Sequence, residues 1–356
     1  MDLVSLAKKF SVQGEPVSSE PFGHGHINHT YRVRTDTDMA YVLQQINQFV
    51  FKDPPALMDN ASRVTEHIRS KGYEALHFLT CENGTCCYRD EDGEYWRCYE
   101  FVDGFCMDMP ETAEDFYQSA LAFGQFQNQL ADFPAHTLSE TIVNFHNTPD
   151  RFRQFKETLA ADPMGRLDTC REEAAFYLNN EAMGCQLQQM LQAGELPLRV
   201  THNDTKLNNV LLDNETRKPK CVLDLDTVMP GLSAYDYGDS IRFGAATAAE
   251  DEQDISKMKL DMDLFRVFTR GFLEACPALT DNEVKALPLG AFTMTLECGF
   301  RFLKDYLDGD HYFHIDYPTH NLVRARTQIA MCADMLKHWE EMEAIVAEEA
   351  RKLREV

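Results

Sequence analysis

The chain has 356 residues, of which 44% are hydrophobic and 26% charged, so a sizeable core and an ordinary globular composition are expected. Its 34 Lys and Arg against 58 Asp and Glu give a formal net charge of −24. Such a surface repels nucleic acid and anionic lipid and excludes both as general partners, although a local site could still hold an anion. No run approaches the about 18 apolar residues of a membrane span, and the first residues do not resemble a secretory signal. We therefore expect a cytoplasmic protein without a membrane partner.

The first hundred residues read as a β-rich segment. Strands are expected to end near Pro21 and to cover residues 30–33, 41–46, 78–81, 86–89 and 95–102. Asn-Gly and Asp-Gly pairs between the later apolar runs are typical of hairpins. Between the third and fourth strands, the spacing of Ala61, Val64 and Ile68 predicts a helix over residues 60–70.

From residue 104 the pattern becomes helical. Thr112 and Asp115 can form a capping box, and one helix is expected over residues 171–193. A short β section follows at residues 196–200, 210–212 and 221–225, and a single apolar stripe runs through the tail from Asp334. The prediction is an α+β fold with a β-rich N-lobe, residues 1–103, and a mainly helical C-lobe, residues 104–356.

The most informative stretch is THNDTKLNNVLLD, which begins at Thr201, followed by VLDLDT, which begins at Val222. Phosphoryl transfer needs a carboxylate that aims the acceptor hydroxyl and accepts its proton, and hard oxygen ligands that hold Mg²⁺ on the triphosphate. Asp204, Asn209 and Asp224 supply this set, with His202 two residues upstream of the first carboxylate.

This segment resembles the catalytic loop of the aminoglycoside phosphotransferase and choline kinase superfamily, the small-molecule relatives of protein kinases. The resemblance implies a protein-kinase-like two-lobed fold with ATP as co-substrate and Mg²⁺ as cofactor. It further implies that Asp204 orients the acceptor and takes its proton, that Asn209 and Asp224 bind the metal, and that His202 is structural.

The N-lobe carries a second part of the resemblance, FGHGHINHTY from Phe22, which lies between two expected strands. Glycines there let the backbone approach phosphates closely, and in the family this loop covers the nucleotide. Backbone groups near residues 100–103 fall where the family's hinge binds adenine. The implied nucleotide-binding residues are Gly23, Gly25, Asn28, Thr30, Gln44, Glu100 and Val102.

One position departs from the family pattern. Its third strand usually carries a lysine that meets the phosphates, but Gln44 stands there, so a pair with a helix residue such as Glu66 cannot form as usual. Lys206, two residues after Asp204, is the nearest obvious cation for the γ-phosphate, with an exposed loop lysine as the alternative.

Further fragments between Phe22 and Asp310, such as YDYGDSIRFG and FRFLKDYLDGD, resemble N-acetylhexosamine 1-kinases. Those enzymes phosphorylate the anomeric hydroxyl of N-acetylglucosamine or N-acetylgalactosamine with ATP. Arg301 lies in an apolar segment, where an unpaired charge is costly, so it should contact a ligand or a carboxylate. The expected sugar-binding residues are Asp204, Arg301, Phe243, His26 and Asp226, the last on the same strand and side as Asp224.

Three alternatives remain open. A choline or homoserine type of small-molecule kinase would have the same catalytic loop. A protein kinase is disfavoured because only 11 residues separate Asp224 from Asp236 and no peptide platform is evident. A non-catalytic kinase-like binding protein is suggested by the missing lysine, but retention of Asp204, Asn209 and Asp224 together argues against it.

Overall fold

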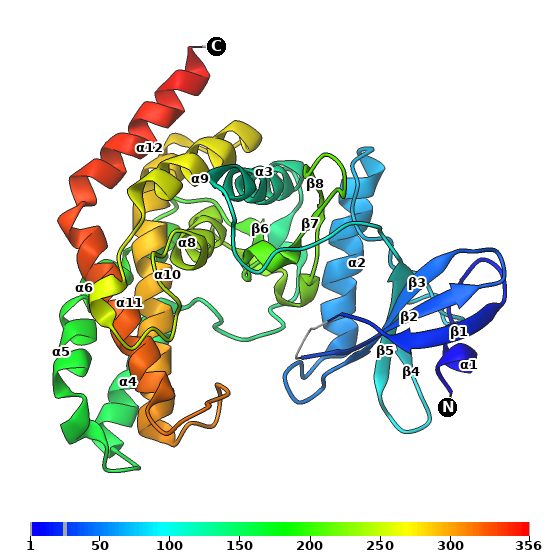
Figure 1. The fold of residues 1–356 in the computed structure, drawn as a ribbon, viewed down its shortest axis with the longest axis horizontal. Coiled ribbons are helices and arrows are strands. Elements are labelled where there is room, and N and C mark those ends of the chain that lie inside the picture. The colour runs from blue at the N-terminus through cyan, green and yellow to red at the C-terminus, as the bar shows by residue number, and fades with distance from the viewer. Residues whose placement is uncertain (1, 24–26, 356) are drawn as a thin grey trace. The chain divides into compact units, whose positions relative to one another are not determined.

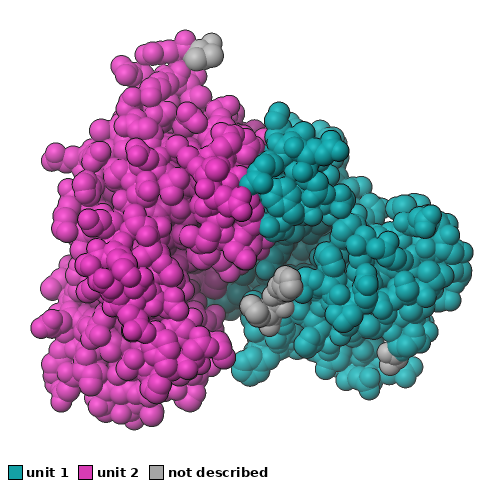
Figure 2. Space-filling model, viewed as in Figure 1, with its two compact units in different colours: residues 1–106, 132–143, 210–230 teal, residues 107–131, 144–209, 231–356 magenta. Residues whose placement is uncertain are grey.

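The computed structural model describes residues 2–23 and 27–355 (Figure 1). The chain divides into two compact units (Figure 2). Unit 1 comprises Met1–Cys106, Asp132–Val143 and Val210–Pro230, and unit 2 comprises Met107–Ala131, Asn144–Asn209 and Gly231–Val356. Each unit is built from separate stretches of sequence, and the division into lobes at residue 103 stays a prediction.

Unit 1 is built on a five-stranded antiparallel sheet with the order β1-β2-β3-β5-β4. Its strands are β1 (Pro16–Pro21), β2 (His29–Thr35), β3 (Ala40–Ile46), β4 (Tyr88–Arg89) and β5 (Tyr95–Glu100). Tyr41 and Leu43 of β3 alternate into a core with Val33 and Cys98, and Val42 between them is buried on the opposite face of the strand. The short helix α1 (Leu3–Ala7) contributes Leu6 to the same core.

The strands expected at residues 30–33 and 41–46 are confirmed, whereas the one expected at residues 78–81 is wrong. Phe78 and Cys81 form only isolated bridges, to Tyr99 and Phe10 respectively. The backbone N–H of Cys81 instead donates to the carbonyl of Thr85 at 2.7 Å, which closes the turn and ends pairing with the sheet. For the same reason, the strand expected at residues 86–89 shrinks to β4.

Helix α2 (Pro54–Ser70) begins six residues before the start that apolar spacing predicts. Asp53 caps it by accepting a hydrogen bond from the backbone N–H of Ala56, and Pro54 occupies the first turn, where its missing N–H costs nothing. Unit 1 also holds the hairpin of β7 (Val210–Leu212) and β8 (Pro219–Val222).

Unit 2 is mainly helical, and its long central helix α10 packs against α4, α8, α11 and α12. Its helices are α3 (Ala113–Gln129), α4 (Thr148–Ala161), α5 (Arg171–Asn179), α6 (Glu181–Gly184), α7 (Gln186–Gln192), α8 (Ser233–Gly244), α9 (Met262–Ala275), α10 (Asp281–Asp308), α11 (His320–Lys337) and α12 (Trp339–Arg354). The remaining elements of unit 2 are β6 (Arg199–Thr201), η2 (Leu167–Thr169), η3 (Leu207–Asn209) and η5 (Ile255–Lys257). Unit 1 also holds η1 (Ala135–Thr137) and η4 (Leu225–Thr227), and β9 (Met229–Gly231) spans the sequence boundary between the units at Pro230 and Gly231.

The capping box of Thr112 and Asp115 is confirmed at the start of α3. The single helix expected over residues 171–193 is wrong, because the chain breaks into α5, α6 and α7. The second break follows Gly184, where a Cβ would come within 2.6 Å of Leu296 on α10, so close packing against α10 accompanies the change of direction. The tail stripe is likewise divided at His338, between α11 and α12.

The α+β class predicted from the sequence is confirmed. No helix within residues 2–23 and 27–355 is long and apolar enough to cross a membrane.

Candidate active site

The segment around Asp204 is held by carboxylates of helix α8. Asp236 accepts the backbone N–H groups of His202, at 2.9 Å, and of Asn203, at 2.8 Å. Burial raises the pKa of Asp236, but these donors and the amide of Gln127, at 2.6 Å, satisfy its oxygens. Asn203 adopts a left-handed φ of 64°, a conformation that Asn tolerates better than most residues. The fold thus fixes the loop backbone immediately before Asp204.

Asp239, one turn further along α8, holds the next part of the loop. It accepts the backbone N–H of Thr205 at 3.0 Å and pairs with the guanidinium of Arg242 at 3.0 Å. Burial alone would raise the pKa of Asp239, but the charges of Arg242 and Lys206 outweigh it and hold that pKa below its usual value. These contacts give Asp239 a structural role in holding the loop. His202 packs edge-on against Phe123 and Phe126 of α3, as a structural histidine does.

Asp204, Lys206 and Asn209 come together in unit 2. The carboxylate of Asp204 is 28% exposed and lies 3.1 Å from the ammonium of Lys206. The side-chain amide of Asn209 donates to the carbonyl of Asp204 at 2.8 Å and to its carboxylate at 3.1 Å. Burial alone would lower the pKa of Lys206, but Asp204 overcomes it and raises that pKa, so Lys206 stays charged. A fixed cation therefore accompanies a partly exposed carboxylate.

Asp224 and Asp226 belong to unit 1, and they do not share a strand as expected. Strand β8 ends at Val222, and Asp224 has a left-handed φ of 53° at the start of η4. In a regular strand the side chains of Asp224 and Asp226 would lie on the same side. The turn separates them, so Asp224 is exposed whereas Asp226 is buried. A non-glycine residue held in this region stores strain of the kind that gathers at functional sites.

Asp226 is bound inside unit 1 by Arg97, a residue that our sequence analysis did not select. The guanidinium of Arg97 forms a buried ion pair with Asp226, and it donates to the side-chain oxygen of Gln44 at 2.8 Å. Asn28 donates to the second oxygen of Asp226 at 2.7 Å, and Gln44 donates to the hydroxyl of Thr30 at 2.9 Å. Four residues predicted at the site thus form one polar network around Arg97. The sequence feature that could have identified Arg97 is its position as a charged residue within an otherwise apolar expected strand, opposite Gln44.

Asn209 in unit 2 and Asp224 in unit 1 each carry an oxygen donor that suits Mg²⁺. Asn209 turns its amide nitrogen toward Asp204, which directs its oxygen away, and the carboxylate of Asp224 is exposed. Both are hard oxygen donors of the kind that Mg²⁺ selects. In the part of the chain that the structure describes, no three His, Cys, Asp or Glu side chains group as a metal site. Such an ion would therefore take its remaining ligands from phosphate and water.

The other predicted nucleotide residues lie around the sheet. Gly23 has a φ of 78° and space around its Cα, as a phosphate-covering turn requires. Gly25 and His26 lie outside the described residues. Glu100 ends β5, and its N–H donates to the carbonyl of His77 at 3.1 Å, so its carbonyl is the group that could serve a nucleotide. Val102 lies two residues further, outside the helices and strands.

Arg301 of α10 is surrounded by aromatic rings. Its guanidinium lies 5.6 Å from the ring centre of Phe145 and 5.7 Å from those of Tyr312 and Phe313. It is half-buried, and its charge lowers the pKa of the buried carboxylate of Glu297 on the same helix. Phe243 is half-buried at the end of α8.

Asp305 fixes the segment that supplies two of these rings. Its carboxylate accepts the backbone N–H groups of His311 at 3.0 Å and of Tyr312 and Phe313 at 2.9 Å. Asp305 thus fixes the backbone that carries two of the rings around Arg301.

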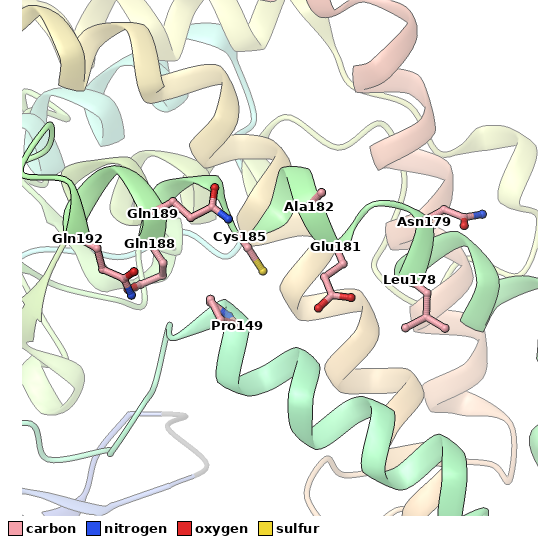
Figure 3. Close-up of a pocket in the computed structure, with 9 residues that line it drawn as sticks. All are labelled: Pro149, Leu178, Asn179, Glu181, Ala182, Cys185, Gln188, Gln189 and Gln192. Carbon is pink, nitrogen blue, oxygen red and sulfur yellow. The ribbon is translucent and has the colours of Figure 1, made fainter.

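A separate pocket of about 560 Å³ lies in unit 2 beside α4, α6 and α7. Figure 3 shows its lining, with Glu181 and Cys185 above Pro149 of α4. The site residues described above are not among the nine residues that line it.

Comparisons with known proteins identify the family and the fold. Residues 18–261 match the model of the phosphotransferase enzyme family. The fold resembles a microcompartment-associated aminopropanol kinase, with a TM-score of 0.66, 16% identity, and coverage of 95% of this chain and 97% of the other. It also resembles choline kinase from Cryptosporidium parvum Iowa II, with a TM-score of 0.61, 12% identity, and coverage of 97% and 98%.

A third solved structure, amicoumacin kinase in complex with AMP-PNP and Ca²⁺, has a TM-score of 0.60 at 13% identity, with coverage of 92% of this chain and 91% of the other. These likenesses confirm the predicted protein-kinase-like fold. The family match covers more than half of the chain, and it includes Gln44, Arg97, Asp204, Asn209 and Asp224. The chain therefore belongs to the phosphotransferase enzyme family, the superfamily of the aminoglycoside phosphotransferases and choline kinases.

Proposed function

We propose that this phosphotransferase is an ATP-dependent kinase that phosphorylates the anomeric hydroxyl of N-acetylhexosamines to give the sugar 1-phosphate. The observation that carries the kinase assignment is the Asp204 loop. Its backbone is fixed by Asp236 and Asp239, while the carboxylate of Asp204 stays partly exposed beside Lys206. A rigid support with a reachable carboxylate is what positioning of an acceptor hydroxyl demands.

In the proposed reaction, Asp204 accepts a hydrogen bond from the acceptor hydroxyl, aims its oxygen at the γ-phosphorus and takes the proton as transfer proceeds. Asn209 and Asp224 would hold Mg²⁺, which would neutralise triphosphate charge when bound. Lys206 adds positive charge beside the transferring group. We assign Gly23, Gly25 and Asn28 of the glycine loop and Thr30 of β2 to the nucleotide, with the backbone of Glu100 and Val102 at the adenine.

The acceptor assignment rests on the sequence resemblance and on the chemistry around Arg301. A sugar offers hydroxyl and amide oxygens to the donors of a guanidinium and an apolar ring face to aromatic side chains. Arg301 and its three rings present both kinds of group. His146 lowers the pKa of Asp239 and of Glu297, and Arg301 also lowers that of Glu297, so the Arg301 and Lys206 regions share one neighbourhood of unit 2. We assign Arg301, Phe243, His26 and Asp204 to acceptor binding.

An amino alcohol is the competing acceptor class, because two of the similar folds belong to an aminopropanol kinase and a choline kinase. Arg301, which we assign to the acceptor, is itself a cation and would repel a cationic acceptor in direct contact. Burial lowers the pKa of Arg151 and the nearby charge of Arg301 lowers it further. Glu297 and Asp150 act on that pKa in the opposite direction, so the region holds charges of both signs.

A panel of acceptors assayed by Mg²⁺-dependent ADP formation tests the proposal. The panel contains N-acetylglucosamine, N-acetylgalactosamine, choline, ethanolamine, aminopropanol, homoserine and an aminoglycoside. We expect the two N-acetylhexosamines to be preferred and phosphorus NMR of the product to show a sugar 1-phosphate. Preference for an amino alcohol would overturn the acceptor assignment, and failure of every acceptor would favour a non-catalytic binding protein.

A further inference from the structure

The third-strand position that lacks a lysine faces a buried arginine on the neighbouring strand. Gln44 of β3 and Arg97 of β5 are direct partners in the antiparallel register, so their side chains share one face of the sheet. We propose that Arg97 is the positioning residue that replaces this lysine, and that it acts through Asp226 on the Asp224 turn and on the glycine loop. The inference deepens the proposed function and rests on it.

The first argument is that Arg97 and Asp226 form a buried ion pair in which each charge compensates the other. Each side chain is 3% exposed, and burial of either charge without the other would be costly. Burial alone would lower the pKa of Arg97, but Asp226 outweighs it and raises that pKa, so the arginine is charged. A charge pair this deeply placed fixes the position of the segment that carries Asp226.

The second argument is that both oxygens of Asp226 are engaged within unit 1. One pairs with Arg97, and the other accepts the amide of Asn28 at 2.7 Å. The carboxylate is only 3% exposed, so a metal or an acceptor could reach its remaining lone pairs only if the surrounding groups moved. Asp226 is therefore an internal anchor in our assignment, rather than the substrate-binding group that the sequence alone suggested.

The third argument concerns what the anchor holds. Asp226 lies inside η4, two residues after Asp224, and Asn60 of α2 donates to the carbonyl of Val228 at 3.0 Å on the other side. Both fixed points follow Asp224 in the chain, so they hold the segment into which its left-handed backbone leads. Outer partners of this kind orient metal ligands, and their loss typically lowers metal affinity by about 10–100-fold.

The same anchor reaches the glycine loop. Asn28 donates to Asp226, while its side-chain oxygen accepts the backbone N–H of Asn47 at 3.0 Å. Asn47 in turn donates to the carbonyl of Ile27 at 3.1 Å. Arg97 therefore stands at the centre of contacts that fix both the end of the glycine loop and the Asp224 turn.

Two variants test the assignment. Arg97→Met combined with Asp226→Leu removes both charges and keeps similar volumes, a kind of replacement that buried pairs often tolerate. Arg97→Lys keeps a cation but loses the planar fork that can serve Asp226 and Gln44 together. Arg89→Met on β4 is the matched control, because Arg89 is an exposed arginine of the same sheet. Thermal unfolding verifies that each variant is folded.

The readouts separate metal positioning from direct phosphate contact. Mn²⁺ binding in the presence of AMP-PNP is followed by electron paramagnetic resonance, and binding of a fluorescent ATP analogue is measured in EDTA. We expect the double variant to bind Mn²⁺ about 10–100-fold more weakly with little change in metal-free nucleotide affinity. Arg97→Lys should recover part of the loss, and Arg89→Met should match the wild type.

Unchanged Mn²⁺ affinity in the folded double variant would overturn the inference. So would a loss of metal-free nucleotide binding at unchanged Mn²⁺ affinity, because it would make Arg97 a direct phosphate ligand. If the wild-type protein fails to bind Mn²⁺ with AMP-PNP, the proposed kinase function is wrong, and the inference falls with it.

Discussion

Asp204 is the residue whose chemistry can be tested most directly. Asp204→Asn keeps the shape of the side chain and an oxygen near Asn209, but the amide cannot take the hydroxyl proton. We expect turnover to fall by about 10²–10⁴-fold while ATP still binds. Steady-state kinetics and nucleotide titration of the folded variant provide the measurement. Near-normal turnover would remove Asp204 from the role of base.

A substitution of Lys206 tests whether its ammonium group compensates the negative charge of the phosphates. Lys206→Met keeps the stem and removes the ammonium that lies 3.1 Å from Asp204. Charge on the γ-phosphoryl group redistributes during transfer, so we expect kcat to fall by about 10²–10³-fold with a smaller change in KM for ATP. Separate determination of kcat and KM checks this split.

Gln44→Ala is the control for Lys206. The neutral amide of Gln44 neutralises no charge, although its oxygen accepts from Arg97, so its loss should cost less than that of Lys206. If Gln44→Ala lowers activity more than Lys206→Met does, the phosphates are positioned by residues of β3, and Lys206 is a surface residue.

Asp224→Ala tests the metal assignment. The exposed carboxylate is a hard ligand that alanine cannot replace, so we expect Mg²⁺-supported activity to be abolished. Activity is measured over a range of Mg²⁺ concentrations. Retention of the normal Mg²⁺ dependence would show that the VLDLD segment does not bind the metal.

Among the elements, α8 and α10 meet at glycines that no side chain could replace. A Cβ on Gly238 would lie 2.2 Å from the backbone oxygen of Gly290, so backbone blocks any outward shift. We expect Gly238→Ala to destabilise the protein by about 1–3 kcal/mol, the typical cost of overpacking. It should also lower kcat, because α8 carries Asp236 and Asp239. Thermal unfolding and kinetics of the same sample measure both, and an unchanged Tm would show that the two helices can separate freely.

Elements governed by local rules could be predicted from the sequence. The alternation in β3, the capping box at Thr112 and the polar residues between β6 and β7 all follow from neighbours in the chain. The beginning of α2 was missed because its apolar spacing starts after the capping residue Asp53. The breaks between α5, α6 and α7 depend on packing against α10, which local spacing does not report.

The candidate site divides in the same way. Asp204 and Asn209 are five residues apart, so their association was predictable. The pairing of Arg97 with Asp226 joins residues 129 positions apart, and only the register of β3 and β5 brings Gln44 beside them. The orientation of Asp226 depends on the left-handed φ of Asp224. The sequence pattern predicts a strand at this position, so it gives no sign of that turn.

For the whole molecule, a charge of −24 means that many carboxylates titrate together as the protein is acidified, and all of them affect its stability. The contribution of Asp239 to this pH dependence can be separated by comparison of the wild type with a variant. Burial opposes ionisation of Asp239, but Arg242 and Lys206 hold its folded-state pKa below the ordinary value of 3.8. The folded protein then binds fewer protons at this site than the unfolded chain. The stabilising contribution is therefore fully present above about pH 4 and is lost as pH falls through the folded-state pKa.

We accordingly expect Asp239→Asn to lower Tm at pH 7, with the difference from the wild type narrowing below about pH 4. Other carboxylates, including Asp236, are common to both proteins and cancel in this difference to first order. Thermal unfolding of both proteins from pH 7 to pH 3 provides the comparison. A difference that is constant or grows on acidification would contradict the ion pair as its source.

The division of unit 1 into separate stretches of sequence has a consequence for synthesis on the ribosome. When residue 106 has emerged, all five strands of the sheet exist, but the third stretch of the unit, Val210–Pro230, has not yet been made. At that stage Arg97 is a cation without the carboxylate of Asp226, and burying it is unfavourable. The nascent sheet should therefore remain open and accessible to proteases until about residue 230 is exposed. Stalled nascent chains of increasing length should become resistant to proteolysis in one step near that length.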